Sequence, residues 1–461
     1  MEFRSLKYVA EACSGDLLKG SPEAMVSRVG TDSRRAAAGE LFFALAGERF
    51  DGHDFLAEVA NKGVVAVVAD RKRVPENLSC GVIGVDNPRQ ALGGLAERYR
   101  ADFNLPVIAV AGSNGKTTTK ELIAAVLRQK LNTLWSEASF NNDIGVPVTL
   151  LRLESKHEAA VLEVGTNHPG ELAPLLRMVQ PRFGVITNIG REHLEFFGDL
   201  AGVAEEEGRL AELLPPTGKL FLNGDDEWSG RLAERARAKV VRVGLEESND
   251  WRGSRLEMDA SGSRFWVDAP HPGFTGEYRI NLLGNHQVVN GLFALALGAE
   301  LGLSRVNIQQ GLTECKPSKM RLQTWIWNEV CVLDDAYNAN ADSMLAALRT
   351  LRQMPCMGRR VAVLGDMAEL GEQSQSAHEE VGRRSAELGV DQLFAVGKMA
   401  AVMASAARAA GLKSVREFAD PMAASDAVKR YLKAGDVMLL KASRATQLEK
   451  LAEALKQAES N

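Results

Sequence analysis

A glycine-rich segment near residue 112 constrains the fold of this chain more than any other feature of its sequence. The segment is Gly112-Ser113-Asn114-Gly115-Lys116-Thr117-Thr118, and it lies between an apolar run that ends at Val110 and a helical pattern that starts near Lys116. A strand, a glycine-rich turn and a helix in this order form a phosphate-binding loop, because backbone N–H groups and the positive end of the helix dipole then face the phosphates. The sequence therefore predicts a nucleotide-binding α/β domain.

Two side chains of this loop suit the chemistry of ATP. Lys116 is placed to neutralise the β- and γ-phosphates, and the Thr117 hydroxyl is placed to bind Mg²⁺. A lysine at a loop tip contributes little to packing, so its removal is expected to leave the fold intact. The pattern departs from a full phosphate-loop signature, because Val110 stands where the first glycine would be. The alternative interpretation is a glycine-rich turn that carries an exposed lysine.

The middle of the chain alternates short apolar runs with helical patterns, as parallel sheets do. The apolar runs have no polar breaks, which indicates strands covered on both faces. The strands are expected at 105–110, 159–164 and 183–188, and the helices at 116–130, 171–180 and 200–214.

The last third of the chain repeats this alternation and predicts a second doubly wound, Rossmann-like unit. Its strands are expected at 330–334, 360–364, 392–396 and 437–440, with helices that begin near Ser343, Ser374, Met399, Pro421 and Thr446. The N-terminal segment is mixed, with apolar runs at 40–44 and 64–68.

These patterns predict an α/β protein of three domains, which agrees with a length of 461 residues. A turn-like Asp86-Asn87-Pro88-Arg89 followed by a helical linker marks the first boundary, and Pro317 follows the second. The expected domains are a small mixed α/β domain at 1–85, a central phosphate-loop domain with a parallel sheet at 86–314, and a Rossmann-like domain at 315–461.

Composition excludes several classes of protein. The net charge is -5 and there is no long basic run, so no nucleic-acid partner is expected. No stretch approaches the ~20 apolar residues that span a bilayer, so membrane insertion is not expected either. The five cysteines are scattered, odd in number and form no C-x-x-C pair, as is typical of reduced thiols. The expected location is the cytoplasm.

Two further polar residues follow expected strands. Glu163 ends the run at 159–164, where a carboxylate points into the ligand crevice and can bind Mg²⁺. His193 lies beyond the next strand, in Asn188-Ile189-Gly190-Arg191-Glu192-His193. The alternatives are a surface ion pair for Glu163 and a structural role for His193, and His168 has no comparable support.

With these residues in this order, the chain resembles the muramyl ligases and their folylpolyglutamate synthase relatives over essentially its whole length. The resemblance implies ATP and Mg²⁺ as cofactors. It implies catalytic roles for Lys116, Glu163, His193 and Arg321, and metal binding by Thr117, Glu163 and His193. Beyond the phosphate loop, it implies contacts to ATP from Asn285, His286, Asn290, Arg321 and Asp335, with Gln287 standing where the family usually has Asn. Lys441 resembles the start of a late family element.

Within that family, segments at 141–147, 337–344 and 364–371 are most similar to the ligases that add D-alanyl-D-alanine. Position 341 departs from them, because it is Ala where they more often have Pro. The resemblance implies that the incoming dipeptide is bound by Tyr337, Asn338 and Asn340. It implies that the UDP-sugar-peptide is bound by Ser33, Arg34, Phe43, Asn141, Asn142 and Thr166.

The implied reaction is one step of peptidoglycan precursor synthesis in the cytoplasm. ATP converts the terminal carboxylate of UDP-N-acetylmuramoyl-tripeptide to an acyl phosphate, and the amine of D-alanyl-D-alanine displaces the phosphate. A monomer is expected. The alternatives are a ligase that adds diaminopimelate or lysine, a folylpolyglutamate synthase, and a phosphate-loop ATPase without ligase activity. Segments 337–344 and 364–371 argue against the other ligases, and whether residue three of the peptide is diaminopimelate or lysine stays open.

Asp86-Asn87-Pro88-Arg89 spells a tetrapeptide that marks the amino-acid pocket of the diaminopimelate-adding ligases, but there it lies in the third domain, so here it says nothing about the amine. In most of the family, a Lys fourteen residues after the site His is carbamylated and helps to hold a second Mg²⁺. That position is Glu207 here, which we expect to bind the metal directly. Glu205 and Glu206 are expected to be solvated.

Overall fold

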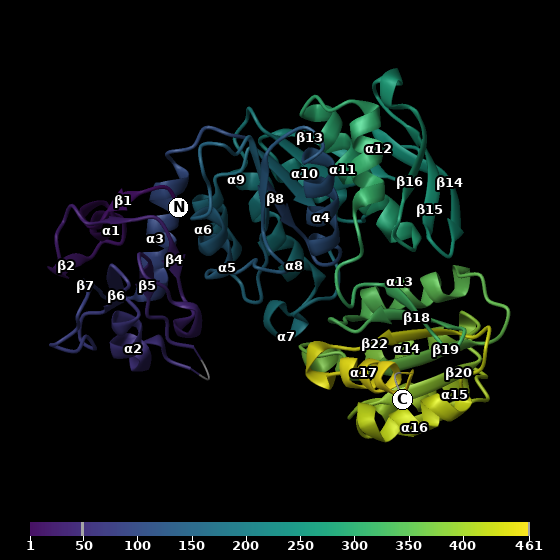
Figure 1. Ribbon diagram of the computed structural model, residues 1–461. Helices are drawn as coiled ribbons and strands as arrows, with labels where there is room; N and C mark the ends of the chain where they lie inside the picture. The colour runs from purple at the N-terminus through teal and green to yellow at the C-terminus, as the bar shows by residue number, and fades with distance from the viewer. Residues whose placement is uncertain (48–49, 460–461) are drawn as a thin grey trace.

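The computed structural model describes residues 1–47 and 50–459 and contains three large sheets that succeed one another along the chain (Figure 1). This order confirms the predicted three-domain α/β architecture. Within the described residues, no helix is long and apolar enough to cross a membrane.

The N-terminal sheet is small and mixed. Its strands are ordered β2-β7-β6-β5-β4, and all neighbours are parallel except β2 and β7. A two-stranded antiparallel ribbon of β1 and β3 lies beside it. The bounds are β1 Arg4–Ser5, α1 Leu6–Ala12, β2 Asp16–Lys19, β3 Met25–Val26, β4 Val29–Gly30, β5 Leu41–Phe43, α2 Leu56–Asn61, β6 Ala66–Asp70 and β7 Gly81–Val85.

The central sheet has nine strands in the order β16-β15-β14-β13-β12-β11-β8-β10-β9. Strands β8 to β14 form the parallel part, and β15 runs antiparallel to both of its neighbours, β14 and β16. The bounds are β8 Val107–Ala111, β9 Thr133–Trp135, β10 Ala159–Glu163, β11 Phe183–Ile186, β12 Lys219–Asn223, β13 Lys239–Gly244, β14 Trp251–Asp259, β15 Gly262–Asp268 and β16 Gly276–Ile280.

Both faces of this sheet are covered by helices, as its apolar strands predicted. Alternate residues of β8 enter two different cores: Ile108 packs with α4, α11 and α12, whereas Ala109 packs with α3, α5, α6 and α9. The bounds of the helices are α3 Pro88–Arg100, α4 Lys116–Leu127, α5 Gly145–Leu150, α6 Leu172–Val179, α7 Leu194–Phe197, α8 Leu200–Glu207, α9 Arg209–Leu213, α10 Ser229–Arg235, α11 Asn285–Glu300 and α12 Arg305–Glu314.

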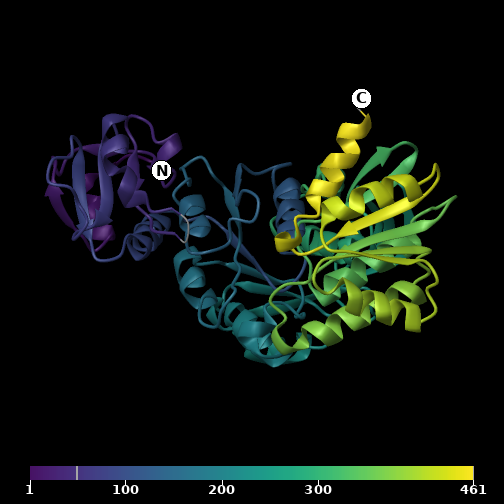
Figure 2. The same cartoon turned by 90° about the horizontal axis from the view of Figure 1, so that it is seen from below.

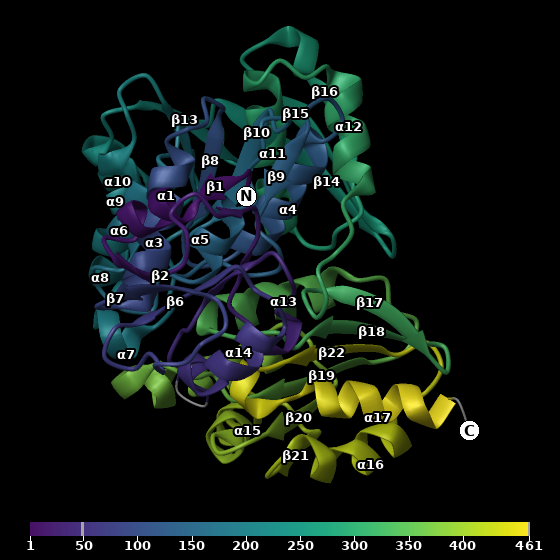
Figure 3. The ribbon, with the colours of Figure 1, turned by 60° about the vertical axis from the view of Figure 1, so that its left-hand side comes forward.

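The C-terminal sheet has six strands in the order β17-β18-β22-β19-β20-β21, all parallel except β17 (Figure 3). One face packs against α13, α14 and α15, and the other against α16 and α17. The bounds are β17 Gln323–Trp327, β18 Val330–Asp335, α13 Ala341–Gln353, β19 Arg360–Gly365, α14 Ser374–Glu387, β20 Gln392–Val396, α15 Ala400–Ala409, β21 Val415–Phe418, α16 Pro421–Tyr431, β22 Val437–Lys441 and α17 Glu449–Glu459.

The expected strands and helices are confirmed to within a few residues, with three differences. The helix expected at 200–214 is divided at Gly208 into α8 and α9. The antiparallel strands β14, β15 and β16 extend a sheet that was expected to be parallel. Strands β17 and β21 lie at the edges of the C-terminal sheet, and no buried apolar run marks them.

Helix α3 connects the first two sheets. It begins where the turn was expected, because the Asn87 side chain accepts hydrogen bonds from the N–H groups of Arg89 and Gln90, and Pro88 occupies the first turn. The helix packs against α1 on one side and against α5 and α6 on the other. Seen from below, the N-terminal part lies apart from the C-terminal part, and the central part lies between them (Figure 2). The domain bounds 1–85, 86–314 and 315–461 stay a prediction.

Candidate active site

A cavity of about 1270 Å³ lies between the central and C-terminal sheets. The strands β8, β10 and β11 run parallel and end together beside it, and Glu163 at the end of β10 lines its wall. Across the cavity, the ends of β18 and β22 place Asp335 and Lys441 side by side. The carboxyl edges of two parallel sheets therefore face the same space, which is where α/β proteins bind ligands.

The glycine-rich segment forms a loop between β8 and α4, as predicted. Gly112 has a φ of 105°, and a Cβ there would lie 2.5 Å from the Thr187 hydroxyl, so only glycine fits. Ser113 is held by Gly190, whose N–H donates to the Ser113 hydroxyl at 2.8 Å. Asn114 exchanges hydrogen bonds with the Asn188 side chain. Residues that follow β11 therefore hold the loop that follows β8 in place.

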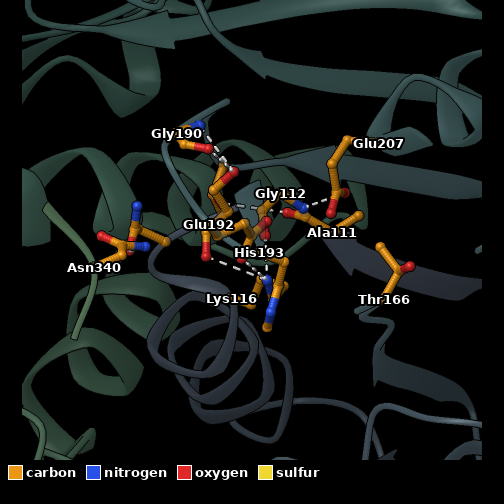
Figure 4. A network of polar contacts seen from close by, with 12 residues as sticks. Ala111, Gly112, Lys116, Thr166, Gly190, Glu192, His193, Glu207 and Asn340 are labelled. Atoms are coloured by element: carbon orange, nitrogen blue, oxygen red, sulfur yellow. Dashed lines mark hydrogen bonds and ion pairs between the residues drawn. The ribbon is translucent and has the colours of Figure 1, made fainter. Parts of the chain in front are cut away.

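Lys116 is folded back onto the loop rather than extended into solvent. Its Nζ donates to the carbonyl oxygen of Gly112 at 2.5 Å and lies 3.2 Å from Oε2 of Glu192 (Figure 4). Burial alone would lower the pKa of this lysine, but the negative charges of Glu192, Glu207 and Glu163 outweigh it, so the pKa lies above its usual value. Lys116 is therefore a largely covered cation, with a side chain 13% exposed, that carboxylates hold in its charged form.

Glu207 lies directly behind this loop. Its Oε2 accepts the backbone N–H of Gly112 at 2.6 Å, and the side chain is buried (Figure 4). Burial raises the pKa of Glu207, against the opposing effects of Lys116 and of the Gly112 N–H. Glu205 is exposed, as expected, but the expectation for Glu206 was wrong: its buried carboxylate accepts the N–H groups of Gly170 and Leu172.

Each of the four residues predicted to bind metal has a buried polar atom without a hydrogen-bond partner among the described residues. These atoms are Thr117 Oγ1, Glu163 Oε2, His193 Nδ1 and Glu207 Oε1. His193 Nδ1 does lie 2.5 Å from Oε2 of Glu369, in an ionic contact without hydrogen-bond geometry. Buried polar atoms without partners are rare and indicate a missing ligand.

No three His, Cys, Asp or Glu side chains within residues 1–47 and 50–459 gather closely enough to hold a metal by themselves. A cation here would therefore take further ligands from phosphates and water, as Mg²⁺ commonly does in nucleotide sites.

Polar residues beside Glu163 extend the site along the central domain. Asn141 donates its side-chain N–H to Oε1 of Glu163 at 2.9 Å, which orients the carboxylate. Asn142 caps the start of α5, and Thr166 donates its hydroxyl to the carbonyl oxygen of His168. All three line the cavity, although the Asn142 side-chain oxygen is already used by backbone N–H groups.

The start of α11 forms another wall. His286, Gln287 and Asn290 line the cavity, and Asn290 donates its side-chain N–H to the side-chain oxygen of Gln287. Burial lowers the pKa of His286 to about 4, which leaves its imidazole neutral at neutral pH. Asn285 is exposed and lies outside the lining, so the structure favours Gln287 over Asn285 as the amide that meets a nucleotide.

The C-terminal domain contributes a compact set of residues. Lys441 Nζ contacts Oδ2 of Asp335 at 2.5 Å and donates to the carbonyl oxygen of Asn338. The Arg321 guanidinium stacks over the Tyr337 ring at 4.2 Å, and the Tyr337 hydroxyl is hydrogen-bonded to Ser139 of the central domain. Asn340 reaches the phosphate loop itself, with Nδ2 2.9 Å from Oδ1 of Asn114. The structure thus brings this set to the loop.

Several of the described non-glycine residues with left-handed φ angles lie at or beside this cavity, and the others are spread over the chain. His193 and Glu369 both have left-handed φ angles, at 49° and 60°, and their side chains meet across it. Met320 and Leu322, on either side of Arg321, are left-handed as well. Non-glycine residues adopt this conformation at a cost and do so preferentially at functional sites.

The residues expected to bind the UDP-sugar in the N-terminal domain do not join this cavity. Ser33 and Arg34 lie in a short helical turn, and Arg34 is exposed and paired with Asp32. Phe43 differs from expectation, because its ring is fully buried in the hydrophobic core of the N-terminal domain. Alternation along a strand sends every second side chain inward, and the sequence did not show to which face Phe43 points.

Sequence reasoning did not single out two residues at or beside the site. Glu192 lines the cavity and pairs with Lys116, and Arg191 next to it binds Asp342 of the C-terminal domain. Glu192 and Arg191 stand next to His193 in the sequence, which was the only available signal for them.

Comparison with known families agrees with this arrangement. Residues 25–100 match the model described as "Mur ligase family, catalytic domain", residues 110–298 match "Mur ligase middle domain", and residues 320–444 match "Mur ligase, glutamate ligase domain". Together these matches cover most of the chain.

Individual relatives match over their whole length. The UDP-N-acetylmuramoyl-tripeptide–D-alanyl-D-alanine ligase of Escherichia coli is 35% identical over 460 residues, covering 98% of each chain. A crystal structure of MurF from Acinetobacter baumannii superposes with a TM-score of 0.90 and 32% identity over 99% of both chains. MurF of Thermotoga maritima, solved in complex with ADP, gives 0.83 and 26% over 94% of this chain and 98% of the other. The chain therefore belongs to the Mur ligase family of ATP-dependent enzymes that form a peptide bond.

Proposed function

We propose that this protein joins D-alanyl-D-alanine to UDP-N-acetylmuramoyl-tripeptide at the expense of ATP, in peptidoglycan precursor synthesis. The single observation that carries the proposal is the contact between the phosphate loop and the segment 337–340 in one cavity, with Asn114 bonded to Asn340. A phosphate loop alone is compatible with any ATPase. A second domain that contacts the phosphate loop can also hold the amine that attacks the acyl phosphate. The names of full-length relatives that share 35% identity support the same reaction.

The reaction has two chemical steps. A carboxylate oxygen of the tripeptide attacks the γ-phosphorus of ATP, the bond to the β–γ bridging oxygen breaks, and ADP leaves. The neutral amine of D-alanyl-D-alanine then attacks the carbonyl carbon of the acyl phosphate. The tetrahedral intermediate expels inorganic phosphate, and the amine loses a proton as the amide forms. Positioning and charge neutralisation account for most of the catalysis in such transfers.

The chain's own residues divide this work. Lys116 turns from Glu192 to the β- and γ-phosphates, whose negative charge replaces that of Glu192 as its partner. Arg321 approaches the γ-phosphate from the other side of the cavity, and its stacking on Tyr337 limits the directions in which it can point. Asn338 and Asn340 face the position from which the dipeptide amine attacks. Two cations from two domains thereby offset charge on the transferring group.

We propose that Thr117, Glu163, His193 and Glu207 would hold Mg²⁺ together with the phosphates. Each has a buried polar atom without a hydrogen-bond partner among the described residues, and three of them offer the oxygen ligands that Mg²⁺ prefers. When bound, Mg²⁺ supplies positive charge that stabilises the phosphoryl group in transfer. Glu163 is held for this task by Asn141.

We also propose how the rest of the substrate lies. The cavity continues from the phosphate loop along α3 and α6, where Arg89, Glu97 and Arg177 line it. This path leads toward the N-terminal domain at 1–85, to which we assign the UDP-sugar through Ser33 and Arg34. We propose that the protein acts as a monomer. Five free cysteines and the use of ATP fit the reducing cytoplasm.

Phosphate release from ATP is expected to require both UDP-N-acetylmuramoyl-tripeptide and D-alanyl-D-alanine. The reason is that phosphate leaves only when the amine attacks the acyl phosphate, and the amine site is formed by the third domain. Measuring phosphate release against a panel of UDP-muramoyl-peptides and amines checks this expectation. Turnover with free diaminopimelate, lysine or glutamate as the amine would contradict the choice of dipeptide, and turnover with ATP alone would favour a simple ATPase.

A further inference from the structure

Arg191 joins the central domain to two helices of the C-terminal domain. Its Nε and Nη2 donate to Oδ1 of Asp342 at 2.9 and 2.6 Å, and its Nη1 donates to Oε2 of Glu380 at 2.6 Å. The backbone N–H of Arg191 donates to the other Asp342 oxygen at 2.7 Å. Asp342 lies in the first turn of α13 and Glu380 lies in α14. One side chain therefore restrains both the distance and the orientation of the C-terminal domain.

This contact is stronger than an ordinary surface ion pair. The Arg191 side chain is 25% exposed, and those of Asp342 and Glu380 are 37% and 27% exposed. Two carboxylates enclose the planar guanidinium with charge-assisted hydrogen bonds, which are shorter and stronger than neutral ones. Gly190 permits the close approach, because a Cβ there would lie 3.0 Å from Oδ2 of Asp342.

The contact of Arg191 with Asp342 and Glu380 also links site residues of the central domain to site residues of the C-terminal domain. On the central side, Glu192 and His193 follow Arg191 directly, and Glu192 holds Lys116. On the C-terminal side, Asn340 precedes Asp342 by two positions and donates a hydrogen bond to Asn114 of the phosphate loop. Any rotation of the C-terminal domain about this contact moves both groups relative to each other.

We propose that Arg191, acting through Asp342 and Glu380, is a positioning residue that sets the C-terminal domain over the phosphate loop. It touches neither phosphate nor dipeptide in this role. Because the reacting groups come from two domains, a displacement of ~1 Å costs about 100-fold in rate. The kinetic consequence rests on the proposed ligase function, but the domain arrangement can be measured without turnover.

The test compares Arg191→Ala, Asp342→Ala and the double variant with the full-length wild type. We expect each single variant to lower kcat/KM for D-alanyl-D-alanine by about tenfold, and the double variant to be no worse than the poorer single one. With a non-hydrolysable ATP analogue and Mg²⁺, small-angle scattering should give a larger radius of gyration for the variants. Binding of the analogue should stay within about twofold, because the loop itself is intact.

A matched control and a charge exchange complete the design. Arg408 of α15 pairs with Glu417 of the edge strand β21 and not with the residues of the domain contact, so Arg408→Ala should change neither kinetics nor scattering. Arg191→Asp combined with Asp342→Arg should recover part of the compaction that each change loses alone. Additive effects of the two single alanine variants, or wild-type scattering in Arg191→Ala, would overturn the proposal. A wild type that compacts with the analogue but forms no peptide bond would overturn the proposed function and leave the positioning role standing.

Discussion

Lys116→Ala is expected to reduce ligation by about a thousandfold or more, because it removes the cation that meets the transferring phosphoryl group inside a buried site. Lys116 contacts the loop itself, whereas Arg321 and Lys441 line the cavity from the opposite domain. Steady-state kcat/KM for ATP, measured with both acceptor substrates saturating, checks the effect. Activity within about tenfold of the wild type would contradict the assignment of the phosphate loop.

The same variant should lose stability, which differs from the expectation drawn from sequence. Lys116 is not a solvated loop tip, since it neutralises Glu192 and lies within the field of Glu207 and Glu163. Removing a buried charge partner leaves carboxylates uncompensated, at a cost of about 1–3 kcal/mol in the free energy of unfolding. Lys116→Arg, which keeps the charge, should be more stable than Lys116→Met, which keeps only the aliphatic stem. Equal thermal unfolding of the two would show that charge compensation is unimportant here.

The central fold could be predicted from sequence because its strands are buried on both faces. A run such as 107–111 can then be apolar at every position, and its strand character depends little on distant contacts. The edge strand β21 at 415–418 carries Arg416 and Glu417 and has no such run, so pairing with β20 decides its conformation. Edge strands are therefore the part of this fold that local pattern could not supply.

The residues of the site also fall into those that the sequence could predict and those that it could not. Residues of the loop 112–118 follow one another in the sequence, so a motif was enough to place them. Contacts such as Asn114 with Asn340 join positions 226 residues apart, and only the packing of two domains brings them together. Phe43 is a residue that was predicted to bind substrate and does not fit this role. Family resemblance named the position, but its side chain faces the core.

The two carboxylate oxygens of Glu207 have different surroundings. Its Oε2 accepts the Gly112 N–H, so it supports the phosphate loop, and its Oε1 is buried without a hydrogen-bond partner among residues 1–47 and 50–459. The hydrogen bond from Gly112 to Oε2 is what a purely structural role predicts. The unpartnered Oε1 is what a metal ligand predicts, at the position where relatives are expected to have a carbamylated lysine.

Glu207→Gln separates these two roles, because glutamine keeps the shape and a carbonyl oxygen for Gly112 but removes the charge. If Glu207 binds Mg²⁺, we expect kcat/KM to fall by about a hundredfold, as typically follows loss of support for a metal, with partial recovery at high Mg²⁺. If it only holds the loop, both the rate and the Mg²⁺ dependence should stay close to wild type. The measurement is the Mg²⁺ concentration that gives half-maximal activity, in the variant and in the wild type.

Bicarbonate gives the complementary test. The carboxylate of Glu207 needs no CO₂ to carry its charge, so wild-type activity should not change when bicarbonate is removed or added. Glu207→Lys introduces a longer side chain whose amine must react with CO₂ before it can present an anionic oxygen pair. This variant should be inactive in CO₂-free buffer, where its cation would face Lys116 in a buried site, and should regain activity as bicarbonate is added. Wild-type dependence on bicarbonate would contradict the role of Glu207, because it would place the carbamate on another residue.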